Sequence, residues 1–113
     1  PFDLVVSGIN PGANVGRSVY HSGTIGAALT ARNGGITGIA VSQAVAEGGY
    51  LGQGLELMLK NQKWHSAAEA AAIAVSCLVD KPLSEAEVLN INVPNLEKED
   101  IKGWVDNYRG WKL

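Results

Sequence analysis

The chain of 113 residues contains one cysteine, few aromatic residues and no excess of positive charge. Because Cys77 has no second cysteine to pair with, no internal disulfide can form, and its Ala/Val-rich setting predicts a small buried hydrophobic residue rather than a nucleophile. A formal net charge of −2 gives no electrostatic basis for binding a nucleic-acid duplex or a membrane surface. No signal peptide and no run of 18 apolar residues occurs, so we expect a cytoplasmic protein.

Small apolar residues and glycine dominate what is present. Alanine, valine and isoleucine are frequent, and the chain has 14 glycines. Such residues allow helices and strands to approach closely, which favours an α/β domain with helices layered on a sheet. The length fits a single domain, 1–113. Because the chain opens at Pro1 without an initiator Met and enters a strand pattern at once, we expect a domain truncated at both ends.

Apolar runs and helical periodicity predict an alternation of strands and helices. Short apolar runs bounded by glycine or proline are typical of buried parallel strands, and periodic segments with caps are typical of helices. A strand–helix–strand order with short connections predicts a parallel pair and a right-handed crossover. The expected strands are 3–7, 36–42 and 88–93, and the expected helices are 22–33 and 66–79.

Both expected helices carry signals at their ends. Ser22 is suited to cap the first helix, which the pair Gly34-Gly35 would end. Ser66 and Glu69 form the pattern of a capping box, in which each side chain accepts from a backbone amide at the start of the helix.

Two segments have weaker patterns. Residues 43–63 match neither a helix nor a strand clearly, and we interpret them as a surface excursion. The polar tail carries Trp104, Tyr108 and Trp111 on a chain otherwise poor in aromatics, which predicts contact with a missing segment or a second subunit.

A glycine- and asparagine-rich loop, 8–16, follows the first expected strand. In open parallel sheets, ligands bind beyond the carboxyl ends of the strands, and Asn10 lies there. An amide oxygen is a poor general base but a reasonable ligand for a hard divalent cation. The same residue can instead make only turn hydrogen bonds, so the pattern leaves both roles open.

Ser22, Gly23 and Thr24 form the second candidate site. Two hydroxyls, free backbone amides and the positive end of a helix dipole would meet there, which suits a phosphate group. The alternative is an ordinary helix cap. The spacing of Gly12 and Gly16 does not match a dinucleotide loop or a P-loop, because the P-loop lysine is absent. Together with Asn10, this stretch predicts a site for an anionic, phosphate-bearing ligand.

Other polar residues have competing interpretations. His21 could protonate a leaving oxygen or remain a solvated loop residue. Arg17 could pair with phosphate. A favourable interaction with a helix C-terminus accounts for Arg32, and His65 is explained as a neighbour of a helix cap.

Four separate motifs together resemble the SurE family of stationary-phase survival proteins, which are metal-dependent 5′/3′-nucleotidases. The motifs occupy residues 3–16, 22–28, 39–42 and 89–94. The resemblance implies a Rossmann-like three-layer sandwich with a mostly parallel sheet, which releases phosphate from nucleoside monophosphates. It implies a divalent cation, Mg or Mn, held in part by Asn10, and a phosphate pocket lined by Ser22, Gly23 and Thr24. It also implies a homodimer or homotetramer.

The chain departs from this family pattern in its catalytic residues. The family's Asn-Asp-Asp-Gly motif and a metal-binding serine would lie upstream of Pro1, so no catalytic residue is assigned within 1–113 and we expect the chain alone to be inactive. His21 replaces a common tyrosine, and Thr30-Ala31 replaces a common Glu-Gly. The alternative is therefore a non-catalytic phosphate- or nucleotide-binding module, or an interaction domain.

Overall fold

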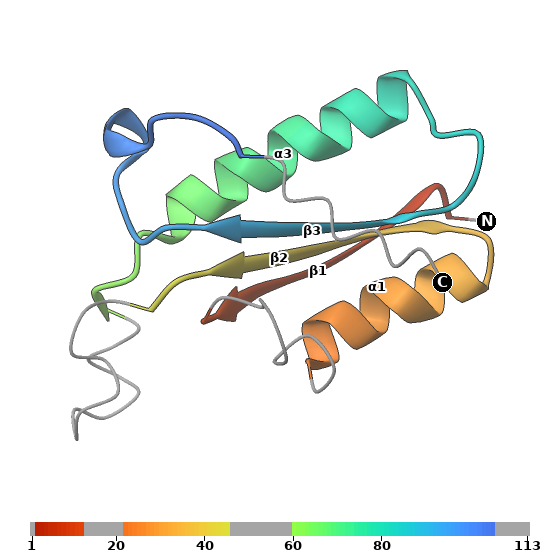
Figure 1. Ribbon diagram of the computed structural model, residues 1–113, viewed down its shortest axis with the longest axis horizontal. Coiled ribbons are helices and arrows are strands. Elements are labelled where there is room, and N and C mark those ends of the chain that lie inside the picture. The colour runs from red at the N-terminus through yellow and green to blue at the C-terminus, as the bar shows by residue number, and fades with distance from the viewer. Residues whose placement is uncertain (1, 13–21, 46–59, 106–113) are drawn as a thin grey trace.

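The computed structural model describes residues 2–12, 22–45 and 60–105. Within these ranges the order of elements is β1 (Leu4–Pro11), α1 (Gly23–Asn33), β2 (Thr37–Gln43), α3 (Trp64–Asp80), β3 (Val88–Val93) and the 3-10 turn η2 (Lys98–Asp100). The three strands form a parallel sheet in the order β1-β2-β3. The helices α1 and α3 lie on opposite sides of this sheet (Figure 1). The expected α/β sandwich with a parallel sheet is thereby confirmed.

The central strand β2 divides the hydrophobic core into two layers. Ile39 and Val41 pack in one cluster with residues of α3, whereas Ala40 packs in the other with Ile25 and Ala28 of α1. Successive side chains of a strand point to opposite faces, so one continuous apolar run serves both layers. Every residue of β2 is buried, and the expected strand 36–42 is confirmed to within one residue at each end.

Small residues bring α1 unusually close to the sheet. A Cβ atom added to Gly38 of β2 would overlap the backbone carbonyl of Ala28, which is itself fully buried. A larger residue at either position would push the helix away from the strand. Gly38 and Ala28 therefore have the packing role that the composition predicts for small residues.

The two crossovers of the sheet have opposite hand. Both connect parallel neighbours in the same direction across the sheet, β1 to β2 and β2 to β3, but α1 and α3 lie on opposite faces. Since right-handed crossovers predominate strongly in proteins, one of the two departs from that rule. As a consequence, the helices that follow the adjacent strands β1 and β2 lie on opposite faces of the sheet at the end where the site is expected.

The ends of α1 match the sequence signals. The Ser22 side chain accepts a hydrogen bond of 3.0 Å from the backbone N–H of Ile25, as an N-cap residue should. Gly34 follows the last helical residue, and Gly35 adopts a positive φ of 85° that suits a residue without a Cβ. The expected helix 22–33 is confirmed.

The capping box expected at Ser66 is wrong. Helix α3 begins at Trp64, and its N-cap residue Lys63 makes no side-chain cap bond. Ser66 lies inside the first turn, is buried, and donates its hydroxyl to the backbone carbonyl of Leu96 at 2.6 Å. The hydroxyl that the local pattern assigned to capping instead bonds to the carbonyl of Leu96, which lies 30 residues away in the chain.

The first strand is longer than expected. It continues past Ser7 to Pro11, so Asn10 belongs to β1 and the loop does not begin at residue 8. The pairing with β2 shifts between Ser7 and Asn10, which is the signature of a bulge. Gly8 permits this bulge because it adopts a φ of 132° and because a Cβ there would overlap the carbonyl oxygen of Val41. The glycine that predicted the end of a strand instead allows the strand to continue.

The expectation that Cys77 is buried is also wrong, because its side chain is exposed. Helix α3 packs on the sheet through a stripe that includes Ala67, Ala74 and Leu78, and Cys77 lies beside this stripe. An alanine-rich helix has apolar residues on every side, so its composition does not identify the face that is buried.

The segment 43–63 and the tail are described only in part. Gln43 is the last residue of β2, so the expected surface excursion does not begin there. Residues 46–59, together with Tyr108 and Trp111, lie outside the described residues. Trp104 is 70% exposed. No helix in the described ranges is long and apolar enough to cross a membrane.

Candidate functional site

The carboxyl ends of all three strands and the N-termini of both helices lie at the same end of the domain (Figure 1). The helix that follows β1 lies on one face of the sheet and the helix that follows β2 lies on the other. Adjacent strands whose helices diverge in this way form a topological switch point, where ligands of open α/β sheets bind. The switch point lies between two short segments. One is residues 10–12, at the end of β1 and one residue beyond it, and the other is residues 42–44, at the end of β2 and one residue beyond it.

Asn10 lies at this switch point, on the face covered by α1. Its neighbour Ile9 packs against the core on the α3 side, so strand alternation directs Asn10 to the opposite face. The side-chain Nδ2 of Asn10 donates to the carbonyl of Gly12 at 2.8 Å, and the Gly12 N–H donates to the carbonyl of Gln43 at 2.7 Å. Asn10 therefore makes a turn bond through its nitrogen, and its Oδ1 has no partner among the described residues.

The N-terminus of α1 presents several hydrogen-bond donors at the same edge and on the same face. The oxygen of Ser22 accepts from Ile25, which leaves its O–H free to donate. The N–H groups of Gly23 and Thr24 precede the first intrahelical hydrogen bond and have no partner among the described residues. With the Thr24 hydroxyl, these groups can bind the oxygens of an anion. The structure therefore brings the two sequence-predicted sites to one edge and one face.

The described residues supply only part of the ligand set that the metal implied by the family resemblance would need. An amide oxygen such as Asn10 Oδ1 is a suitable ligand for a hard dication. No group of three or more His, Cys, Asp or Glu side chains that could hold a metal occurs among residues 2–12, 22–45 and 60–105. A site of this kind usually recruits carboxylates, so Asn10 could complete a metal site but not form one alone.

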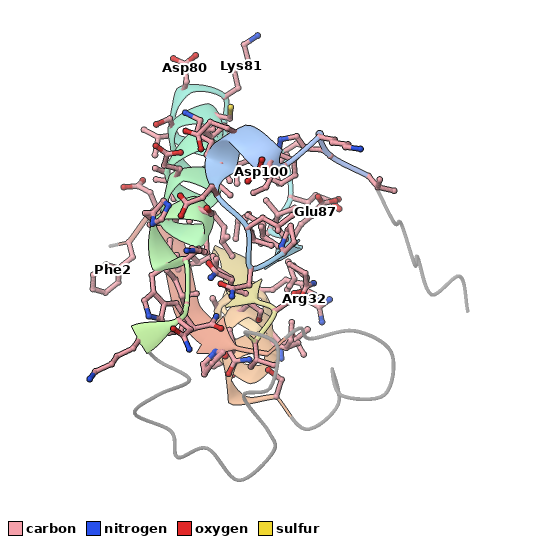
Figure 2. The ribbon with its side chains drawn as sticks, turned by 90° about the vertical axis from the view of Figure 1, so that its left-hand side faces the viewer. Phe2, Arg32, Asp80, Lys81, Glu87 and Asp100 are labelled. Carbon is pink, nitrogen blue, oxygen red and sulfur yellow. The ribbon has the colours of Figure 1, made fainter. Side chains whose placement is uncertain are left out.

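The other charged candidates that the structure describes lie at the last turn of α1 or at the start of α3. Arg32 is exposed in the last turn of α1, at the opposite end of that helix from Ser22. Its side chain lies at the surface of the domain (Figure 2). The His65 imidazole lies 2.8 Å from Glu97, which also pairs with Lys63 at 3.2 Å. Hydrogen bonds from His65 and then from Lys63 hold the pKa of Glu97 below its ordinary value. His65 is thus a hydrogen-bond partner of Glu97 at the start of α3. Arg17 and His21 lie outside the described residues.

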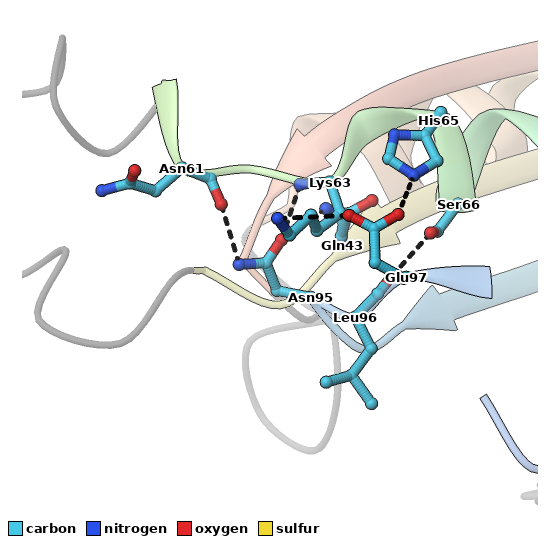
Figure 3. Close-up of polar contacts among 8 residues, drawn as sticks. All are labelled: Gln43, Asn61, Lys63, His65, Ser66, Asn95, Leu96 and Glu97. Atoms are coloured by element: carbon cyan, nitrogen blue, oxygen red, sulfur yellow. Dashed lines mark hydrogen bonds and ion pairs between the residues drawn. The ribbon is translucent and has the colours of Figure 1, made fainter. Parts of the chain in front are cut away.

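A polar cluster around the buried Gln43, on the α3 side of the switch point, was not identified from the sequence (Figure 3). Gln43 is fully buried and donates its Nε2 to the side-chain oxygen of Asn95 at 2.9 Å. The same Asn95 oxygen accepts from the backbone N–H of Lys63 at 2.7 Å, and Asn95 Nδ2 donates to the carbonyl of Asn61 at 3.1 Å. The one sequence signal was a long polar residue, Gln43, directly after an apolar strand pattern.

These features define a Rossmann-like α/β protein whose candidate ligand site lies at the carboxyl edge of a parallel sheet. The model of one family, described as survival protein SurE, matches residues 1–109. The chain belongs to the SurE family.

Two relatives and one solved structure illustrate this similarity. The 5′-nucleotidase SurE of Carboxydothermus hydrogenoformans is 37% identical over 103 residues, which are 91% of this chain and 35% of that protein. The 5′-nucleotidase SurE of Methylobacterium nodulans is 36% identical over 101 residues, 89% of this chain and 36% of that protein. The crystal structure of the SurE protein from Aquifex aeolicus has a TM-score of 0.71 and 34% identity, and covers 88% of this chain and 35% of that one. The chain thus spans about a third of the length of these relatives.

Proposed function

We propose that the protein carrying this chain is a metal-dependent phosphatase that hydrolyses nucleoside 5′/3′-monophosphates to nucleoside and phosphate. Its family membership and the names of its relatives support a nucleotidase. The observation that carries the proposal is the meeting of Asn10 and the N-terminus of α1 at one edge and on one face of the sheet. A phosphate ester and a cation bound to it need such neighbouring sites.

The phosphate group would be held at the N-terminus of α1. The amides of Gly23 and Thr24 and the hydroxyls of Ser22 and Thr24 would donate to its oxygens, and the helix dipole would favour its negative charge. Donors fixed by a helix need little reorganisation as charge develops on the phosphoryl oxygens, so they can stabilise the transition state as well as the substrate.

Asn10 would contribute one oxygen ligand to a divalent cation, Mg or Mn. Its Nδ2 is held by the carbonyl of Gly12, which orients the Oδ1 atom. When bound, such a cation polarises a phosphoryl oxygen and lowers the pKa of a bound water. The remaining ligands would come from outside the described residues.

A second candidate is a phosphate- or nucleotide-binding module without catalysis. It is favoured by one observation, that the described residues contain no cluster of carboxylates suited to a metal. A homodimer or homotetramer is part of the main proposal. The exposure of Trp104 and Val105, 70% and 83%, supports a protein partner at that surface.

The test uses the full-length protein and a titration of Mn²⁺ or Mg²⁺ during hydrolysis of a nucleoside monophosphate. If Asn10 is a metal ligand, Asn10→Ala should raise the metal concentration for half-maximal activity severalfold, with partial recovery in excess metal. Asn33→Ala is the matched control, because Asn33 is exposed at the opposite end of α1. It should leave the metal titration unchanged.

Asn10→Asp separates metal binding from substrate binding. A carboxylate should tolerate or strengthen cation binding, but its charge should repel the incoming phosphate, so the two affinities should move in opposite directions. If Asn10 serves only the turn, Asn10→Ala would lower stability by about 1 kcal/mol and leave the metal titration unchanged. An active wild-type protein that is insensitive to chelators would favour a metal-independent mechanism. An inactive wild-type protein that still binds phosphate would favour the second candidate.

A further inference from the structure

The side-chain oxygen of Gln43 is a buried hydrogen-bond acceptor without a partner among the described residues. The residue is 0% exposed, and its Oε1 has no hydrogen-bond partner in the described part of the chain. Buried polar atoms in native proteins almost always have a partner, because leaving one unpaired forfeits its hydration without compensation. An exception at a ligand-binding edge of a sheet calls for a functional explanation.

Neighbouring backbone groups fix the orientation of this amide. Asn95 Oδ1 accepts from the backbone N–H of Lys63, and Asn95 Nδ2 donates to the carbonyl of Asn61 (Figure 3). Turning the Asn95 amide would place two donors together at Lys63. With Asn95 Oδ1 so placed, Gln43 must direct its nitrogen toward Asn95, since the reverse would oppose two acceptors. The unpartnered atom of Gln43 is therefore its oxygen.

The backbone of Gln43 borders the proposed active site. Gln43 is the register partner of Pro11, the residue after Asn10, and its carbonyl accepts from Gly12. Its side chain lies on the α3 side of the sheet, as do those of Ile39 and Val41, whereas the phosphate donors lie on the α1 side. A ligand held by its phosphate at α1 would reach this oxygen only by extending across the switch point to the α3 side of the sheet.

We propose that Gln43 Oε1 accepts a hydrogen bond from an uncharged O–H or N–H group of the substrate's nucleoside, either a ribose hydroxyl or a base amino group. This inference rests on the proposed function. A carbonyl oxygen pairs with a hydrogen-bond donor or a cation, so deprotonated phosphate oxygens are excluded from this position. Gln43 would then be a specificity-determining residue, because a donor that fits satisfies the buried acceptor and a substrate lacking it leaves the acceptor unpaired.

The test compares nucleotide and non-nucleotide substrates in the full-length protein. Gln43→Met keeps the length of the side chain but removes the acceptor. It should lower kcat/KM for AMP by roughly 10-fold, the size typical of a hydrogen bond lost to a buried group, and change that for p-nitrophenyl phosphate less than twofold. Gln62→Met is the matched control, because Gln62 is also buried and also donates its amide, to the carbonyl of Ala44 at 3.0 Å. It should change both substrates equally.

The donor itself can be found without a protein variant. The wild type is assayed with 2′-deoxy-AMP, 3′-deoxy-AMP and the purine ribonucleotide that lacks the amino group. For one of the three analogues, the wild-type kcat/KM should be roughly 10-fold lower than that for AMP. The Gln43→Met variant should show no such difference between that analogue and AMP. This arm can refute the inference even if Gln43→Met does not fold. If all three analogues match AMP within twofold, or if Gln43→Met lowers AMP and p-nitrophenyl phosphate equally, the inference is overturned.

A binding measurement separates this inference from the proposed function. Adenosine carries the donors but no phosphate, so calorimetric titration with adenosine requires neither turnover nor metal. Gln43→Met should weaken its binding roughly 10-fold relative to the wild type and Gln62→Met. A wild-type protein that hydrolyses no phosphate ester but shows this difference would refute the phosphatase and retain the role of Gln43. Activity on AMP without a difference in adenosine binding would do the reverse.

Discussion

Replacing Gly38 by alanine tests whether the close contact between α1 and β2 positions the phosphate site. The new Cβ would overlap three backbone atoms of Ala28, its carbonyl oxygen, carbonyl carbon and Cα. Backbone atoms cannot rotate away as a side chain can, so α1 must move outward from the sheet. Overpacking of this kind costs about 1–3 kcal/mol, less the roughly 0.5–1 kcal/mol gained from restricting the unfolded chain. We expect a net destabilisation of about 1–2 kcal/mol.

Gly26→Ala is the matched control for this prediction. Gly26 lies in α1, and nothing is within 4 Å of a Cβ added there. The same substitution should therefore stabilise the protein by about 0.5–1 kcal/mol, because alanine favours the helix over glycine. Denaturant unfolding of the full-length variants followed by circular dichroism measures both changes.

The kinetic consequence distinguishes positioning from stability alone. Outward movement of α1 would carry Ser22 and Thr24 away from Asn10, so Gly38→Ala should raise KM for a nucleoside monophosphate at a temperature where the variant is fully folded. Gly26→Ala should leave KM unchanged. Equal effects of the two substitutions on stability would refute the close contact at Gly38. A destabilised Gly38→Ala protein with normal KM would refute the link between this contact and the site.

Three further predictions follow from particular side chains. Thr24→Val should raise KM and lower kcat without changing the circular dichroism spectrum, because it keeps the shape but removes a donor from the proposed phosphate pocket; unchanged kinetics would reduce Thr24 to a helix residue. Ser66→Ala should lower the unfolding free energy by about 1 kcal/mol by removing a buried hydrogen bond, whereas Glu69→Gln should change it little, the reverse of what a capping box requires. The hydrogen bond from His65 lowers the pKa of Glu97 below 4.5, so the stabilisation of the folded protein by the ionised Glu97 is present above that pH and is lost as pH falls through the lowered value. The unfolding midpoints of wild type and Glu97→Gln should therefore converge in acid, and a constant difference would contradict this.

Much of the fold could be predicted because its signals are local. The α1 cap joins Ser22 to a residue three positions away, and the glycines that end this helix follow it directly. Strand β2 is a short, largely apolar run that follows Gly35, and β3 is a run of apolar residues and asparagines that ends at Pro94. These patterns identified both strands to within one residue. Interactions within one helical turn or one strand depend on neighbours that the sequence displays side by side.

The candidate site was predicted in composition but not in geometry. Asn10 and Ser22 were identified as residues suited to bind a cation and a phosphate. That they share a face depends on the bulge at Gly8, because one extra residue in a strand exchanges the faces of all the residues beyond it. The bulge in turn depends on the carbonyl of Val41, which belongs to the neighbouring strand.

The sequence by itself determined the identity and order of the strands and helices and the cap of α1, and it singled out the residues proposed to hold a phosphate at the N-terminus of that helix. Only the tertiary structure decided which polar groups meet across the sheet. Gln43 reaches Asn95 over 52 residues of chain, and Ser66 reaches Leu96 over 30. These pairs form because the sheet places the ends of β2 and β3 beside the start of α3. The periodicity of the sequence does not predict these hydrogen bonds, because the partners come together only when the helix packs on the sheet.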